Sequence, residues 1–245
     1  MTQPAPLYIV ASPRPRVGKT LIAGLLIEYI RGTERLIEGY DLHPREPALA
    51  ERFTEIVWPL DIADTRGQME LFDRLLSDNS ITKVIDLGYE RYEQFFAVMG
   101  EIDFVQEALR RGIEPIVLFV ADPSLATAQS YAQLRHRLPT TTFVPAHNEF
   151  VSIMFAKEDF PPTHRECAVI RIPRLSPLVR GVIDRPSFSF GDYISSQPGG
   201  PTEVHHWIAT IFAAFRELEL RLMMGRLASS LGGVRTESGE LRRVR

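Results

Sequence analysis

Short apolar runs alternate with longer amphipathic ones along most of the chain. The short runs are rich in β-branched and aromatic residues, as strands are, and they cover residues 7–11, 35–40, 82–86, 115–121, 141–146 and 167–172. Patterns with helical spacing lie between most of them, at residues 18–31, 65–78, 91–111 and 123–137. Strands separated by crossover helices predict an α/β fold, a three-layer structure with a mainly parallel sheet and helices on both faces.

The last third of the chain departs from this alternation. Residues 184–201 are punctuated by Pro, Gly and Ser, and residues 203–224 then form the strongest amphipathic helix pattern in the chain. Its apolar positions are Val204, Trp207, Ile208, Ile211, Phe212, Phe215, Leu218 and Leu222. We expect this helix to dock on the sheet; a surface for a partner or a membrane is the alternative. The polar composition that follows predicts one domain over 1–224 and a flexible tail over 225–245.

Composition limits the classes of function. A chain of 245 residues with 44% hydrophobic content can bury one substantial core. The 28 basic and 31 acidic residues give a formal charge of −3, which argues against a general positive field for nucleic acids. The only cysteine, Cys167, cannot form an internal disulfide, and the apolar stretch 113–121 is too short to cross a bilayer. With no secretory pattern at the start, these features predict a cytoplasmic protein, with surface attachment to a membrane left open.

The sequence "ASPRPRVGKTL" joins the first strand to the first helix and has the form of a phosphate-binding loop. In such loops, backbone N–H groups at the start of a helix converge on phosphate oxygens. Lys19 would bring a charge to the β- and γ-phosphates, and the Thr20 hydroxyl would bind magnesium. The strict pattern has glycine where Pro13 stands, so an ordinary turn is the alternative. The expected nucleotide-binding residues are Arg16, Val17, Gly18, Lys19, Thr20 and Leu21.

Written from Arg14, the loop "RPRVGKT" resembles the deviant phosphate loop "KGGVGKT" of the ParA/MinD family of P-loop ATPases. Those proteins position plasmids, chromosomes and division sites, and some relatives serve conjugal transfer. In this alignment Arg14 replaces the signature lysine, which in the family reaches the partner subunit's nucleotide across an ATP-bound dimer. Pro15 and Arg16 replace two glycines, so the charge is kept and the backbone freedom is lost.

Two later motifs agree with the resemblance. In "YDLHP", Asp41 matches the first aspartate of the family's Asp-x-Asp-Pro pattern, while His43 replaces the second, which in the family helps to place the attacking water. In "KVIDLG", Asp86 closes an apolar strand and is similar to the Walker B carboxylate that holds magnesium through water. The stretch "VIRIPRLSPLVRGVIDRPSF" resembles the family's adenine-pocket segment, with a short helix after "IPR". Pro173 in that segment and Asn148 are therefore expected near the base.

The resemblance implies an ATP- and magnesium-dependent switch with slow hydrolysis, in which Lys19, Arg14 and Asp41 are catalytic and Thr20 and Asp86 hold the metal. It also implies a nucleotide-dependent homodimer and an adaptor partner bound to DNA or a membrane, with direct contact to either left open. A non-hydrolysing adaptor or scaffold with a degenerate site is the main alternative, since Pro15 and Arg16 depart from the motif. A small-molecule enzyme of the same superfamily is a third. No zinc site is expected.

Overall fold

A computed structural model describes residues 4–152, 160, 169–185, 187–196 and 202–237 of the chain. Within this part, seven strands form one sheet in the order β3-β2-β4-β1-β5-β6-β7, with every pairing parallel. The strands are β1 (Ala5–Ala11), β2 (Ile37–Asp41), β3 (Val57–Pro59), β4 (Thr82–Asp86), β5 (Ile113–Ala121), β6 (Thr142–Asn148) and β7 (Ile170–Ile172). The predicted parallel α/β sheet is confirmed. Cys167 lies outside the described residues.

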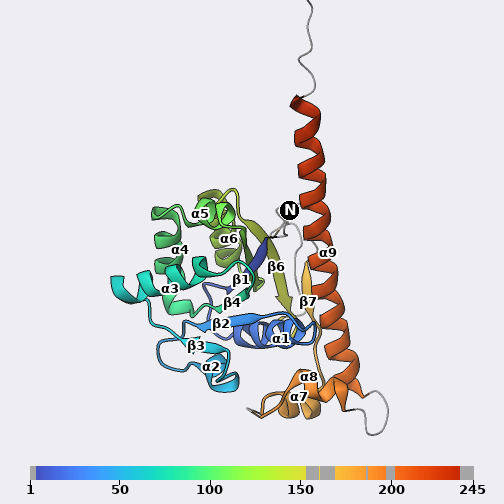
Figure 1. Cartoon of the computed structure of the whole chain (residues 1–245). Coiled ribbons are helices and arrows are strands. Elements are labelled where there is room, and N and C mark those ends of the chain that lie inside the picture. The colour runs from blue at the N-terminus through green and yellow to red at the C-terminus, as the bar shows by residue number, and fades with distance from the viewer. Residues whose placement is uncertain (1–3, 153–159, 161–168, 186, 197–201, 238–245) are drawn as a thin grey trace, which may run out of the picture.

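Helices cover both faces of this sheet (Figure 1). They are α1 (Lys19–Arg31), α2 (Ala48–Arg52), α3 (Thr65–Ser77), a 3-10 turn η1 (Tyr89–Arg91), α4 (Tyr92–Glu101), α5 (Phe104–Arg110), α6 (Leu125–Arg137), α7 (Pro177–Ile183), α8 (Phe190–Ser195) and α9 (Glu203–Glu237). One core lies between the sheet and α1, α8 and α9, and a second lies between the sheet and α3 to α6. In β1, Tyr8 and Val10 belong to the first core and Leu7 and Ile9 to the second, the alternation expected of a strand.

The strand register brings the sequence motifs to one edge of the sheet. Asp41 at the end of β2 lies directly beside Asp86 at the end of β4. Asp86 in turn pairs with Val10 of β1, just before the phosphate-loop sequence begins. Ligands of parallel α/β sheets bind at the carboxyl ends of the strands, so the fold assembles the predicted site from three adjacent strands.

The amphipathic pattern of α9 docks on the sheet side as predicted. Trp207, Ile211 and Phe215 are buried in the first core. A carboxylate adds a polar clamp, because Glu219 accepts hydrogen bonds from the Tyr8 hydroxyl at 3.1 Å, the Tyr29 hydroxyl at 2.8 Å and Arg35 Nη1 at 2.8 Å. The docking of α9 is thus fixed by apolar burial and by one charged acceptor shared among β1, α1 and the chain that follows α1.

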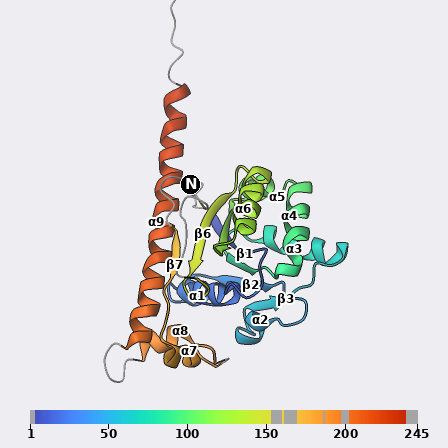
Figure 2. The ribbon, with the colours of Figure 1, turned by 180° about the vertical axis from the view of Figure 1, so that it is seen from behind.

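The end of α9 differs from the expectation. The helix continues to Glu237, whereas the pattern indicated an end near 224 and a flexible tail from 225. Arg226, Leu227 and Ala228 are good helix formers, and extending a helix is far easier than nucleating one. The C-terminal part of α9 projects past the sheet (Figures 1 and 2). No helix in the described residues is both long and apolar enough to span a membrane.

Other differences have local causes. The helix expected over 91–111 is divided into α4 and α5, because Asp103 has a positive φ of 48° and interrupts the helical backbone. A short helix, α8, forms inside the Pro/Gly/Ser-rich stretch 184–201, where the Ser189 hydroxyl caps it by accepting from Asp192 N at 3.1 Å. β3 and α2 were not predicted, since three and five residues are too few for periodicity to identify.

The docking of α9 can be tested by truncating one buried ring. Phe215→Ala is expected to lower the free energy of unfolding by about 3–5 kcal/mol, because it removes a buried aromatic side chain and leaves a cavity. Leu220→Ala on the exposed side of the same helix should cost less than about 1 kcal/mol. Urea denaturation measures both. Equal, small losses would show that α9 is not docked on the core.

Candidate functional site

The loop between β1 and α1 requires glycine at its last position. Gly18 has a φ of 93°, in the left-handed region that glycine adopts without strain. A Cβ atom at Gly18 would also lie 2.2 Å from Nδ2 of Asn148, which is too close for any side chain. Asn148 Nδ2 donates a hydrogen bond to the Val17 carbonyl at 2.9 Å. The end of β6 therefore holds the phosphate loop in place.

Arg16 keeps a glycine conformation without being glycine. Its φ is 58°, and it stands where the resembled family has the second of its two glycines. For a residue with a Cβ atom, the left-handed region costs roughly 1–2 kcal/mol. The substitution was expected to deprive the loop of backbone freedom, yet the backbone at Arg16 adopts the positive φ that glycine would adopt. The loop thus stores a small strain and retains its shape.

The first turn of α1 offers free backbone donors. No side chain caps the helix at Gly18, and the first intrahelical bond runs from Ile22 N to the Gly18 carbonyl at 3.1 Å. The N–H groups of Lys19, Thr20 and Leu21 precede that bond, so they have no intrahelical partner. A helix start with unpaired N–H groups and a positive dipole end attracts anions, phosphate above all.

Lys19 places a buried cation beside these donors. It is 4% exposed, and its Nζ atom donates to the Arg14 carbonyl at 3.0 Å. Burial lowers the pKa of Lys19, and the charges of Asp86 and Glu90 partly oppose this. No carboxylate of the described residues lies within ion-pair distance of Nζ. An anion bound at the loop would supply the missing counter-charge.

Arg14 lies on the outer side of the loop. It is 48% exposed, and its Nε atom is 3.3 Å from Oδ2 of Asp122, which follows β5. Asp122 itself accepts hydrogen bonds from the backbone N–H and the hydroxyl of Ser124. An exposed ion pair of this kind contributes little to stability. Arg14 is therefore free to exchange Asp122 for another anion.

Two carboxylates and one imidazole meet behind the loop. Donor atoms of Asp41, His43 and Asp86 all lie within 4.8 Å of one another. His43 Nδ1 is 2.8 Å from Asp41 Oδ1 and 3.5 Å from Asp86 Oδ2. Burial lowers the pKa of His43. The hydrogen bond to Asp41 and the charges of both carboxylates raise it by more, so the net shift is upward.

Asp41, one of the residues expected to be catalytic, has both carboxylate oxygens engaged in hydrogen bonds. It is fully buried, and its Oδ2 accepts from the N–H groups of Leu49 at 2.9 Å and Ala50 at 3.2 Å, at the start of α2. Its Oδ1 accepts from both the backbone N–H and Nδ1 of His43. With these bonds Asp41 fixes α2 and His43, which is a positioning role.

Asp86 fits the predicted metal site. It is fully buried, and neither carboxylate oxygen has a well-formed hydrogen bond within the described residues. Burial raises the pKa of Asp86 to about 6; Asp41 adds to the rise, while His43, the Thr20 hydroxyl and Lys19 oppose it. A buried carboxylate without a hydrogen bond gains from a cation. Asp86 and Thr20 are thus the oxygen ligands that the structure offers to a magnesium ion.

The predicted adenine residues have mixed placements. A cavity of about 270 Å³ adjoins the loop, and residues of the loop, of the chain after β6 and of α7 line it. Its lining residues are Arg16, Gly18, Leu21, Asn148, Phe150, Val151, Arg180, Ile183 and Asp184. Pro173 does not line it; its carbonyl accepts from Trp207 Nε1 at 2.6 Å. The α7 side chains were missed, although the segment around "IPR" did indicate a short helix there.

Comparisons with known proteins establish the fold. The structure is similar to the MinD cell division protein of Aquifex aeolicus, with a TM-score of 0.53 at 12% identity over 86% of this chain and 97% of that one. The MinC:MinD complex from the same organism gives a TM-score of 0.52 at 13% identity, over 86% and 96%. No protein-family model matches the sequence, and no curated protein matches it significantly. The chain has the MinD fold, which confirms the resemblance seen in its loop at the level of architecture.

The buried charge of Asp86 predicts a pH dependence of stability. The folded protein keeps the Asp86 proton up to about pH 6, whereas the unfolded chain releases it near 3.8. Asp86 therefore makes the folded state less stable as pH rises from about 4 to 6. Asp86→Asn has no proton to lose here, so its free energy of unfolding should not show this fall. The difference in unfolding free energy, variant minus wild type, should therefore rise by up to about 3 kcal/mol between about pH 4 and pH 6.

Urea denaturation at several pH values, without nucleotide, measures this difference. Asp73→Asn is the control, because it makes the same chemical change at an exposed position on α3. A constant difference for Asp86→Asn would contradict the burial of an unpartnered carboxylate.

Proposed function

We propose that this chain is a nucleotide-dependent switch of the ParA/MinD type, which binds ATP with magnesium and dimerises in that state. The observation that carries the proposal is the start of α1, whose N–H groups have no intrahelical partner, with the buried Lys19 beside it and, behind it, Asp86, whose oxygens have no well-formed hydrogen bond within the described residues. These three features together match the needs of a triphosphate and its cation. The MinD fold supports the proposal but does not by itself assign a ligand.

The roles of individual residues follow from their positions. The N–H groups at the start of α1 and Lys19 would hold the phosphates, and the base would lie in the cavity beside α7. Thr20 and Asp86 would hold magnesium, which neutralises phosphate charge. Holding the phosphates and neutralising their charge at the loop are what these residues would contribute to phosphoryl transfer.

Hydrolysis is proposed to be slow. His43 stands where the resembled family has a water-placing aspartate, and its Nδ1 atom is already engaged by Asp41 and Asp86. The raised pKa of His43 favours the imidazolium, which has no lone pair to accept a proton from an attacking water. The same observation favours the second candidate function, an adaptor that binds nucleotide without turnover.

The proposed partners are a second copy of the chain and an adaptor protein. MinD of Aquifex aeolicus was solved in complex with MinC, so an adaptor protein is a reasonable partner class for a chain of this fold. Partition of plasmids or chromosomes, positioning, and conjugal transfer are the processes that such a switch would serve. A nucleotide-bound homodimer would present the surface that the adaptor recognises.

ATP binding tests the site. Lys19→Ala should weaken ATP binding about tenfold to a hundredfold, because a hydrogen bond to a charged group contributes about 1.5–3 kcal/mol. Isothermal titration calorimetry in magnesium buffer measures it, with Arg66→Ala on the exposed surface of α3 as the control. Equal affinity of the wild type and Lys19→Ala would remove the loop from consideration as a nucleotide site.

Assembly tests the switch. The wild type is expected to be a monomer alone and a dimer with a non-hydrolysable ATP analogue and magnesium. Arg14→Ala should abolish the dimer and leave ATP affinity within several-fold of the wild type. The reason is that the Arg14 side chain lies on the outer side of the loop, paired with Asp122, and not at the phosphate site of its own subunit. Light scattering gives the mass, and Arg45→Ala serves as the exposed control.

Two results would count against this. If ATP binds and the wild-type mass does not change, the adaptor proposal replaces the switch. If Arg14→Ala still dimerises, Arg14 is not the residue that links the nucleotide to the partner subunit.

A further inference from the structure

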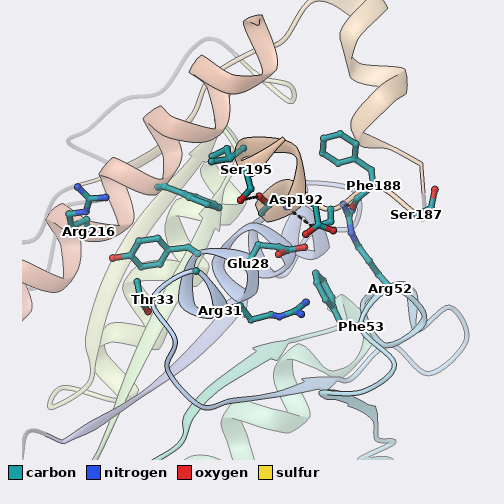
Figure 3. Close-up of a pocket in the computed structure, with 16 residues that line it drawn as sticks. Glu28, Arg31, Thr33, Arg52, Phe53, Ser187, Phe188, Asp192, Ser195 and Arg216 are labelled. Carbon is teal, nitrogen blue, oxygen red and sulfur yellow. Dashed lines mark hydrogen bonds between the residues drawn. The ribbon is translucent and has the colours of Figure 1, made fainter. Parts of the chain in front are cut away.

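A second, larger cavity lies beside the far half of α1. Its volume is about 590 Å³, and it is enclosed by α1, the end of α2, α8 and α9 (Figure 3). It shares no lining residue with the cavity at the phosphate loop. Its wall is of mixed polar and apolar character, and its apolar side chains are those of Tyr29, Phe53, Phe188, Ile194 and Phe212. Pockets of this size and lining are typical of small-molecule sites.

A buried carboxylate lines this cavity without a partner. Glu28 is 5% exposed, and within the described part of the chain it forms neither an ion pair nor a hydrogen bond through its carboxylate. Its Oε2 atom packs so close to α8 that a Cβ atom at Gly191 would lie 2.9 Å away. The docking of α8 thus holds Glu28 against the cavity wall. A glutamate buried to this degree is usually paired, so this carboxylate is available to a ligand.

A guanidinium lies nearby and is also incompletely paired. Arg52 at the end of α2 donates from Nη2 to the Phe188 carbonyl, and its guanidinium carbon lies 4.6 Å from the centre of the Phe190 ring. Its Nε atom is buried and has no hydrogen-bond partner among the described residues. Burial lowers the pKa of Arg52, and the charges of Glu28 and Asp184 oppose this shift. The side chain is thus held in place with one donor unused.

The opposite charges in the cavity form no close ion pair with one another. Figure 3 shows Glu28, Arg31 and Arg52 gathered at one end of the cavity. No nitrogen of either arginine lies within the 4.0 Å of a Glu28 oxygen that an ion pair requires, in the residues that the structure describes. A ligand with one charge would satisfy one group and repel the other. A molecule with a cation at one point and an anion at another satisfies both.

We propose that this cavity binds a zwitterion, an α-amino acid or short peptide with an apolar side chain. Its ammonium group would pair with Glu28, its carboxylate with Arg52 and Arg31, and its side chain would pack on Phe53 and Phe188. Arginine suits a carboxylate because it donates two parallel hydrogen bonds, and an ammonium gains further from neighbouring aromatic rings. A polyphosphate nucleotide lacks the cation that Glu28 requires.

Ligand chemistry provides the first test. Free L-leucine, L-phenylalanine and the dipeptide of the two are titrated calorimetrically into the full-length protein, each against its N-acetylated and its C-amidated form. At least one free zwitterion should bind with one-to-one stoichiometry, and blocking either terminus should weaken binding at least tenfold. A preference for the dipeptide over both amino acids would assign the site to peptides, and the reverse to free amino acids.

Variants then locate the binding. Glu28→Gln should weaken binding at least tenfold, and in that variant N-acetylation of the ligand should cause no further loss, because both changes remove the same contact. Arg52→Gln should weaken binding and reduce the loss caused by C-amidation without abolishing it, because Arg31 still faces the ligand carboxylate. Glu51→Gln, next to Arg52 and exposed, and Arg45→Gln, exposed on the loop before α2, are the controls and should bind as the wild type does. The ligand-side comparisons in the wild type stand even where a variant does not fold.

The proposal is independent of the phosphate loop, so Lys19→Ala should bind the zwitterion unchanged. Absence of detectable binding by all three compounds at concentrations up to about 10 mM would overturn it. Binding that is insensitive to blocked termini, or equal in the wild type, Glu28→Gln and Arg52→Gln, would overturn it as well.

Discussion

Two buried carboxylates stand side by side at the ends of β2 and β4, and the arrangement of the candidate site depends on how their mutual repulsion is relieved. Asp41 and Asp86 are register partners, and both are fully buried. Like charges so close together repel, and the single imidazole of His43, with Nδ1 facing both, relieves part of that repulsion. Asp41 receives the remaining hydrogen bonds it needs from α2. Asp86 does not, and it is therefore the group that gains most from a cation.

The loop likewise combines groups that are fully hydrogen-bonded with groups that are not. Asn148 bonds the Val17 carbonyl and packs against Gly18, while in the described part of the chain no carboxylate pairs with the N–H groups at the start of α1 or with the Lys19 side chain. Arg16 has a left-handed backbone, which is strained for a residue with a Cβ atom, and the loop keeps its shape at that cost. Structural groups are saturated and the groups facing the candidate ligands are not. This contrast distinguishes a binding site from an ordinary strand–helix turn.

The sequence predicted those parts of the molecule that rest on local periodicity. The parallel sheet, α1, α3, α6 and the docking face of α9 follow from apolar spacing over ten or more residues. The loop and Asp86 were found because each directly follows an apolar strand. β3 and α2 were missed because they are too short, and the division of α4 from α5 was missed because it depends on the backbone of one residue, Asp103.

Contacts between distant segments were beyond the reach of the sequence. Asp41 was expected to be catalytic, and only the structure shows that it caps α2 and holds His43. Asn148 was expected to face the base; the structure places it in the lining of the cavity beside the loop, and its amide also secures the Val17 carbonyl from 131 residues away. Glu28 gave no signal at all, since a lone glutamate in an apolar helix becomes notable only once α8 and α9 are seen to enclose it.

The proposed function depends on the N–H groups at the start of α1 that have no intrahelical partner. Their rate of hydrogen exchange, measured with and without magnesium and ATP, tests directly whether they bind phosphate. Exchange in peptides covering residues 12–22 is expected to slow when ATP is added, because the phosphates would occupy those donors. Peptides covering the exposed α3 should exchange at an unchanged rate. If ATP leaves exchange at residues 12–22 unaltered at saturating concentration, those donors do not bind phosphate and the loop is only a turn.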